Sequence, residues 1–79
     1  MTLRETYEYG KEQLNIAGIP EFELDAWYLL EHVTGMNRTQ YFLNSDVEVE
    51  ESKLQLYREY ISKRMIRIPL QHLTGVQEF

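Results

Sequence analysis

Side chains that could carry acid–base, nucleophilic or metal chemistry are few in this chain and stand far apart. The only two histidines are His32 and His72, and there is no cysteine, so the ligand spacing typical of zinc sites is missing. We expect His32 to be solvated on the polar side of a helix. For His72 we expect local hydrogen bonding or a contact between domains. The pattern favours neither a metal site nor a catalytic histidine.

Three carboxylates follow one another closely at Glu21, Glu23 and Asp25. Paired carboxylates can act as acid and base, but these stand where a helix is expected to begin. Negative charge is favourable there because of the helix dipole. The four glycines are isolated, so there is no glycine-rich phosphate loop, and no serine has plausible histidine and aspartate partners for a covalent mechanism. The residues therefore indicate no catalytic group and no cofactor-binding group.

Positive charge gathers in one segment of an otherwise acidic chain. Residues 53–67 carry a net charge of +4, whereas the whole chain carries −5. The overall charge argues against direct nucleic-acid binding. The local charge fits two interpretations: favourable placement near a helix C-terminus, or a patch that docks an acidic or phosphate-bearing partner. The cations are Lys53, Arg58, Lys63, Arg64 and Arg67.

Two aromatic residues lie beside the expected buried faces of their helices. Trp27 flanks the apolar stripe of the second helical stretch, and Tyr60 flanks that of the fourth. They fit either of two roles. They flank the core, or they form an exposed patch for a partner, because tryptophan, tyrosine and arginine are enriched in binding hot spots.

Length and composition bound the fold. The 79 residues, 43% of them hydrophobic and 27% charged, make one small folded domain with one modest core. The lack of cysteine fits a reducing compartment. No apolar run approaches the ~20 residues of a membrane span, and the first residues lack the apolar core of a signal peptide. These features predict a cytoplasmic protein that contacts no membrane.

Helix signals divide the chain into four main stretches. We expect helices over residues 3–17, 21–34, 39–44 and 49–66, and a single helical turn at 70–74. Thr2 and Glu5 have the spacing of a capping box. Gly18 and Gly35 stand where a left-handed residue commonly ends a helix. The third stretch is too short to be stable alone, so we expect packing to hold it.

The second stretch is apolar on two sides. Phe22, Ala26, Leu29, Leu30 and Val33 have the spacing of a buried helical face. Leu24 and Tyr28 form a second apolar face on the same helix. We therefore expect this helix to be central and to be contacted from two sides.

Together these elements predict an all-α fold: a small four-helix bundle of the up-down type over residues 1–68. Residues 69–79 are then the start of a linker. Its last residues, 76–79, alternate apolar and polar like the first strand of a hairpin. Because a lone strand cannot satisfy its backbone groups, we expect the chain to be cut within this linker.

Two segments, taken together, resemble the bacterial release-factor glutamine methyltransferases, the HemK/PrmC family. "LLEHVTG" (29–35), with Asp25 and Ala26 before it and Arg38 after it, resembles the second helix and following turn of that family. "SKRMIRIPLQHLTGVQEF" (62–79) resembles the end of its N-terminal bundle. The resemblance covers essentially the whole chain. The matching positions are Leu29, Leu30, Gly35, Arg38, Arg64, Pro69, Gly75, Glu78 and Phe79.

The resemblance implies a helical domain joined through a β-hairpin to a Rossmann-like methyltransferase domain. Such a protein transfers a methyl group from S-adenosylmethionine to the glutamine of the Gly-Gly-Gln motif of peptide-chain release factors. The family's Asn-Pro-Pro-Tyr motif and glycine-rich cofactor loop do not occur in these 79 residues. The resemblance therefore places no catalytic or cofactor-binding residue here, and we expect this chain alone to be inactive.

The role expected for this chain is to bind and orient the release factor. The candidate partner-binding residues are Trp27, Arg38, Arg58, Tyr60, Lys63, Arg64 and Arg67. The candidate junction with the chain's own catalytic domain consists of Pro69, His72, Gly75, Glu78 and Phe79. A competing interpretation is that Arg64 and Arg67 only cap their helix or pair with the missing domain.

Two other functions remain open from the sequence. The chain could be a standalone helical module that serves as an adaptor between proteins. It could also bind nucleic acid through the basic face of residues 53–67, although the negative net charge disfavours this.

Overall fold

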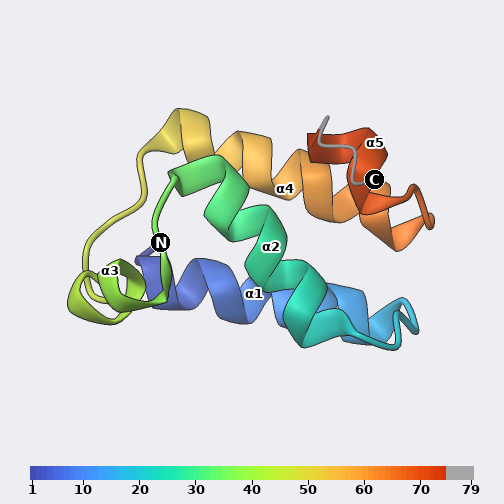
Figure 1. Ribbon diagram of the computed structural model, residues 1–79, viewed down its shortest axis with the longest axis horizontal. Helices are drawn as coiled ribbons and strands as arrows, with labels where there is room; N and C mark the ends of the chain where they lie inside the picture. Colours follow the sequence, from blue (N-terminus) through green and yellow to red (C-terminus); the bar gives the residue numbers. More distant parts are fainter. Residues whose placement is uncertain (75–79) are drawn as a thin grey trace.

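Three long helices and two short ones make up the computed structural model, which describes residues 1–74. Figure 1 shows α1 (Leu3–Ile16), α2 (Phe22–Thr34), α3 (Arg38–Leu43), α4 (Glu51–Met65) and α5 (Leu70–Thr74). The predicted all-α small bundle is confirmed. The predicted strand at residues 76–79 lies outside the described residues.

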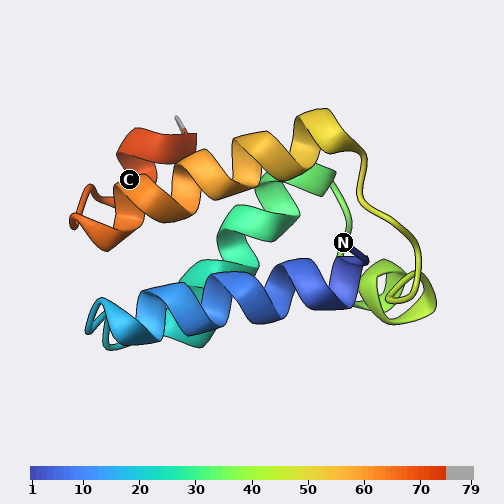
Figure 2. The ribbon, with the colours of Figure 1, turned by 180° about the vertical axis from the view of Figure 1, so that it is seen from behind.

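The three long helices α1, α2 and α4 form the bundle. Seen from behind in Figure 2, α1 and α4 run in the same direction and α2 runs against both. The third helix is only six residues long and lies at the end of the bundle where α1 begins (Figure 1). The bundle therefore has three long helices rather than four. The short α3 is held by packing, as its length predicts.

Local signals set the ends of α1 and α2. The Thr2 hydroxyl accepts a hydrogen bond from the Glu5 N–H at 3.2 Å, and the Glu5 carboxylate accepts one from the Thr2 N–H at 2.8 Å. This is the predicted capping box. Gly18 and Gly35 have φ values of +79° and +72°, the left-handed conformation that glycine adopts without a steric penalty. The helix boundaries deviate from the expected ones by at most two residues.

We expect the Thr2→Ala variant to lose about 1 kcal/mol of unfolding free energy, because the cap hydrogen bond is lost. Hydrogen bonds from Thr2 hold the pKa of the Glu5 carboxyl below its ordinary value. The stabilising contribution of Glu5 is thus present at neutral pH and is lost as the pH falls through its folded-state pKa. Urea denaturation at several pH values measures both effects.

The matched control for the pH effect is Glu5→Gln, which keeps an acceptor oxygen without a titrating group. This variant should lose less stability on acidification than the unmodified chain. An equal loss in both would contradict a role for the Glu5 carboxylate.

A tight contact between α1 and α4 lies at the centre of the core. Tyr57 is fully buried, and its hydroxyl donates a hydrogen bond to the Ala26 carbonyl at 3.0 Å. Gly10 of α1 faces this hydroxyl, and a Cβ atom at position 10 would overlap it. Burial raises the pKa of Tyr57, so the phenol stays a neutral donor. Gly10 is therefore needed for its small size.

The expected two-sided burial of α2 is wrong within the described residues. Leu29 and Leu30 are almost completely buried, but Leu24 is 40% exposed and Tyr28 is 46% exposed. The reason is that α1 and α4 both pack on one side of α2. The short α5 also contacts α2 but leaves these two side chains accessible.

Candidate partner-binding surface

The fold separates the residues that the sequence grouped as a partner-binding patch. Of these residues, Lys63 lies on the side of α4 that faces away from its buried residues Leu54, Tyr57 and Ile61. Lys63 is exposed there, and its ammonium lies 3.1 Å from the Glu59 carboxylate. An exposed ion pair of this kind contributes little to stability, so Lys63 is available to a partner.

Two exposed apolar side chains accompany Lys63 on α4. Leu56 is 39% exposed and Ile66, which follows the last residue of the helix, is 74% exposed. Leu56, Lys63 and Ile66 are spaced seven and three residues apart, so they follow one another along one side of the helix. We call these three residues the α4 stripe. Apolar groups beside a cation, on a side that the bundle leaves open, are suited to a protein partner.

Arg58 and Tyr60 point to opposite flanks of α4. The guanidinium of Arg58 lies 5.8 Å from the ring centroid of Tyr9 in α1. Tyr60 is partly buried and its ring centroid lies 5.8 Å from that of His32 in α2. His32 is exposed, as expected, but its ring contacts Tyr60. Arg58 and Tyr60 thus lie on either side of the α4 stripe.

Arg64 forms an ion pair with a buried carboxylate. Its Nε donates to the Asp25 carboxylate at 3.0 Å, and Asp25 is only 5% exposed. A second guanidinium nitrogen, Nη1, donates to the Ile68 carbonyl at 3.2 Å. The pair joins α4, α2 and the segment before α5. Asp25 therefore interacts with a specific cation as well as with the helix dipole. Arg64 stabilises the fold, so little of it is available to a binding partner.

Arg67 closes the end of α4. It has a φ of +70°, which is uncommon for a residue with a side chain. Its guanidinium donates to the Ala17 carbonyl at 3.2 Å. The Ile68 N–H donates to the Lys63 carbonyl at 3.2 Å, the bond that ends many helices. Arg67 thus links the end of α4 to the end of α1, while its side chain remains exposed.

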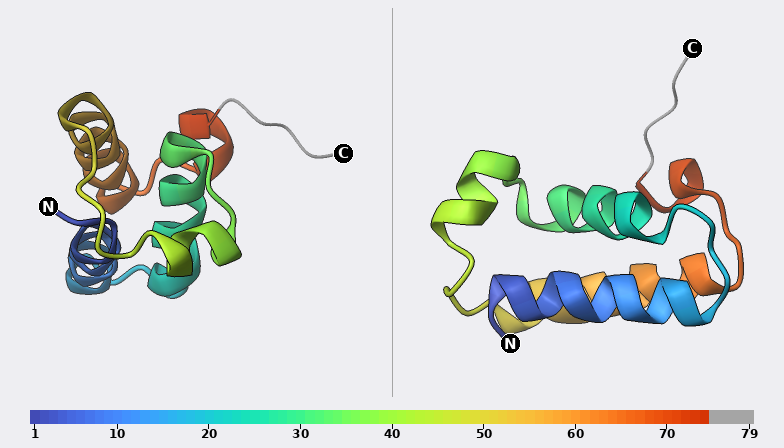
Figure 3. Two further views of the ribbon diagram at one scale, coloured as in Figure 1. Left: turned by 90° about the vertical axis from the view of Figure 1, so that its left-hand side faces the viewer. Right: turned by 90° about the horizontal axis from the view of Figure 1, so that it is seen from below.

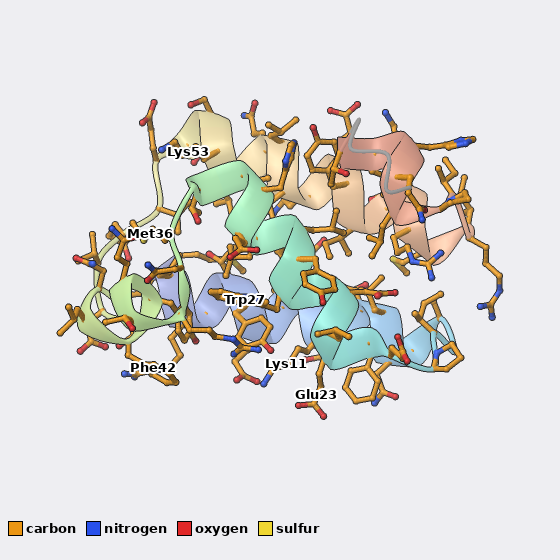
Figure 4. The ribbon with its side chains drawn as sticks, viewed as in Figure 1. Lys11, Glu23, Trp27, Met36, Phe42 and Lys53 are labelled. Carbon is orange, nitrogen blue, oxygen red and sulfur yellow. The ribbon has the colours of Figure 1, made fainter. Side chains whose placement is uncertain are left out.

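Trp27 and Arg38 lie in an aromatic cluster between α1, α2 and α3. The rings of Tyr7, Trp27 and Tyr41 meet edge to face, with centroids 5.5 to 5.9 Å apart. Trp27 is 5% exposed, so it packs in the core, one of the two roles that the sequence left open. The guanidinium of Arg38 lies 4.2 Å from the Trp27 ring. The Lys11 ammonium lies 4.6 Å from the centroid of the Tyr7 ring, and Figure 4 shows Lys11 and Trp27 near each other.

The junction residues are described only in part. The backbone N–H of His72 donates to the Pro69 carbonyl at 3.0 Å, and the His72 side chain is exposed within α5. Leu70 and Leu73, in this expected single turn, pack against the core. Gly75, Glu78 and Phe79 lie outside the described residues.

One small pocket opens between the start of α1 and the loops on either side of α3. Its volume is about 170 Å³. Met36 and Lys53, which border it, are labelled in Figure 4. The other lining residues are Leu3, Thr34, Val47, Glu48, Val49 and Glu50.

Two features are absent from residues 1–74. Among them, no group of three histidine, aspartate or glutamate side chains could hold a metal ion. In the same residues, no helix combines the length and the apolar character that crossing a membrane requires.

Comparison with known proteins decides the family. The model of the PrmC N-terminal domain matches residues 5–75, which is most of the chain. The chain belongs to the PrmC N-terminal domain family. This confirms the resemblance on which the sequence interpretation rests.

The relatives of this PrmC N-terminal domain include longer proteins that are named as methyltransferases. A release factor glutamine methyltransferase of Deinococcus radiodurans is 40% identical over 79 residues, which are 100% of this chain and 28% of the relative. Its Escherichia coli namesake is 38% identical over 55 residues, 70% of the chain and 20% of the relative. A bifunctional methyltransferase of Rickettsia conorii is 27% identical over 78 residues, 99% of the chain and 15% of the relative.

The chain thus spans less than a third of the length of these relatives. No solved structure matches it.

Proposed function

We propose that this chain is the substrate-binding domain of a protein-glutamine methyltransferase that modifies peptide-chain release factors. The family assignment and the names of the relatives support this reaction. The glutamine of the release factor's Gly-Gly-Gln motif would accept the methyl group. The bundle would bind and orient the release factor, and the cytoplasm would be its location, in keeping with a chain that has no cysteine.

The described residues do not suit S-adenosylmethionine, the methyl donor implied for the whole protein. The pocket beside Met36 has a volume of about 170 Å³, whereas small-molecule sites typically have about 300–1,000 Å³. The glycines are isolated in the sequence, so the glycine-rich cofactor loop that the family resemblance implies does not occur here. We therefore assign the cofactor and the chemistry to a separate catalytic domain that would follow the junction at residues 69–79.

The α4 stripe is the observation that carries the binding role. Ile66 and Leu56 expose apolar surface beside the Lys63 ammonium. Burying such surface against a partner is favourable, at roughly 25 cal/mol per Å². Lys63 would then select an acidic patch on the release factor. Arg67, exposed beside Ile66, would add a second cation.

Binding far from the reacting atom is useful for this chemistry. A glutamine amide is a poor nucleophile, so the rate depends on holding donor and acceptor in a productive geometry. Contacts with remote parts of a large substrate can supply the free energy for that positioning. A rigid bundle with an exposed apolar and basic stripe is suited to provide them.

The test is a double substitution in the full-length enzyme, Lys63→Glu with Ile66→Asp. Both side chains are exposed, so the fold should tolerate the change. We expect kcat/KM for a whole release factor to fall about tenfold or more, because two hot-spot contacts of over ~1 kcal/mol each would be lost. Methylation of a short Gly-Gly-Gln peptide should be unchanged, since the peptide cannot reach the stripe.

The matched control is Arg58→Glu, which reverses a charge on the α1 flank of the same helix. It should have a much smaller effect than the double substitution. If the double variant methylates the release factor normally, the stripe is not the binding surface. If full-length protein methylates neither release factor nor peptide, the proposed activity itself fails.

A further inference from the structure

The outer side of α2 presents a regular stripe that the bundle does not cover. Glu21, Leu24, Tyr28 and Glu31 are spaced three, four and three residues apart, so they lie along one side of the helix. Leu24 and Tyr28 are 40% and 46% exposed, and both glutamates are exposed. We call these four residues the α2 stripe. An apolar pair at this spacing is typical of a helix that is contacted on both sides.

The charges at the ends of the α2 stripe are not neutralised by the bundle. Within residues 1–74, the ion pairs of the acidic side chains involve Glu8, Asp25, Asp46, Glu48 and Glu59. Glu21 and Glu31 are not among them. The stripe therefore combines an apolar centre with a carboxylate at each end, which is complementary to an apolar patch bordered by lysine or arginine.

The ion pair of Arg64 fixes the segment that leads from α4 to α5. Arg64 bonds Asp25 of α2 and the Ile68 carbonyl, only two residues before α5 begins. It thereby ties the segment that leads out of α4 to α2. The left view of Figure 3 shows α5 lying beside α2, and α5 contacts both α2 and α4. The described part of the chain therefore ends in a helix that packs against α2.

We propose that the α2 stripe is the docking surface for the methyltransferase domain of the same chain. The inference rests on the proposed function, because it requires the part of the protein that the longer relatives have. Those relatives are several times longer than this chain, which covers 28% of the Deinococcus radiodurans protein and 15% of the Rickettsia conorii protein. A covalently attached domain has a high effective concentration at a nearby surface, so a modest apolar stripe is enough to hold it.

Docking at α2 leaves the α4 stripe free for the release factor. The side chains of the α4 stripe point away from the core of the bundle, and α2 packs against the opposite, buried side of α4. The helical bundle would thus contact the catalytic domain through α2 and the release factor through α4. The domain facing the α2 stripe is expected to present an apolar patch bordered by cations.

Thiol labelling in the full-length protein tests the docking. These 79 residues contain no cysteine, so Tyr28→Cys and Leu24→Cys each introduce a single thiol into this domain, and peptide mass spectrometry reports its modification by iodoacetamide. The control is Phe42→Cys, on α3, where the side chain is 69% exposed. We expect labelling at positions 24 and 28 to be at least about tenfold slower than at position 42 in the native protein, and equal in urea.

Two outcomes would overturn the proposal. The first is labelling at position 28 as fast as at position 42 in the native protein. The second is protection that disappears on dilution, which would show that a second copy covers the stripe. The methylation assay is done on the same unmodified protein. A failure of the proposed function therefore appears as absent methylation, and a failure of docking appears as fast labelling.

Discussion

Replacing Gly10 by alanine should lower the free energy of unfolding by about 2–4 kcal/mol. The added methyl group would overlap the buried Tyr57 hydroxyl, so the ring must move. Overpacking of a core costs about 1–3 kcal/mol, and a lost buried hydrogen bond, here to the Ala26 carbonyl, costs about 1 kcal/mol or more. At an uncrowded position inside a helix, the same substitution stabilises by about 0.5–1 kcal/mol. A lower free energy of unfolding therefore indicates the overlap with Tyr57, whereas a higher one indicates an uncrowded position.

Urea denaturation of three further variants isolates the contact. Tyr57→Phe removes the hydroxyl, and the Gly10→Ala/Tyr57→Phe pair should be more stable than the sum of the single effects predicts. Gly35→Ala is the matched control, because a methyl group there meets no atom within 4 Å but φ is +72°. It should cost about 1 kcal/mol through backbone conformation alone. A neutral or stabilising Gly10→Ala variant would contradict the packing described here.

The Arg64→Met variant should lose about 3–5 kcal/mol of unfolding free energy at neutral pH. The substitution leaves the buried Asp25 carboxylate, which is 5% exposed, without its cation, and an unpaired buried charge is strongly destabilising. The loss also breaks the hydrogen bond to the Ile68 carbonyl. Because that bond holds the segment before α5, we expect α5 to exchange its amide hydrogens faster in this variant.

The pair of substitutions Asp25→Leu and Arg64→Met should recover most of this stability. Apolar side chains of similar volume can replace a buried ion pair without loss. Lys63→Met is the control, since its pair with Glu59 is exposed and its removal should change stability by less than about 1 kcal/mol. If Arg64→Met costs no more than Lys63→Met, the buried pair does not hold α2 and α4 together.

Local signals in the sequence were sufficient for the elements of this fold. The Thr2–Glu5 capping box, the left-handed glycines at 18 and 35, and the spacing of apolar residues all act within a few residues of the chain. Each therefore predicts a helix end or a buried face without knowledge of neighbours. The family could also be recognised from the sequence, because the model of the PrmC N-terminal domain matches residues 5–75.

The partner-binding residues could not be sorted in the same way. The sequence places Arg64 one residue from Lys63, yet Arg64 is partly buried against Asp25 and Lys63 is exposed. No local pattern in the sequence predicts this pair, because Asp25 lies 39 residues from Arg64 in the chain. Trp27 likewise proved to be a core residue covered by Arg38. Both outcomes depend on how three helices are rotated against one another.

The sequence by itself thus determined the helices, their ends, the single small core and the family. Only the tertiary structure decided which cations are free, which aromatic residues are buried, and which apolar side of α2 remains uncovered. The physical reason is the distance along the chain over which each effect acts. Helix formation and capping depend on neighbours within one or two turns, whereas the burial of a side chain depends on contacts between helices that are distant in the chain.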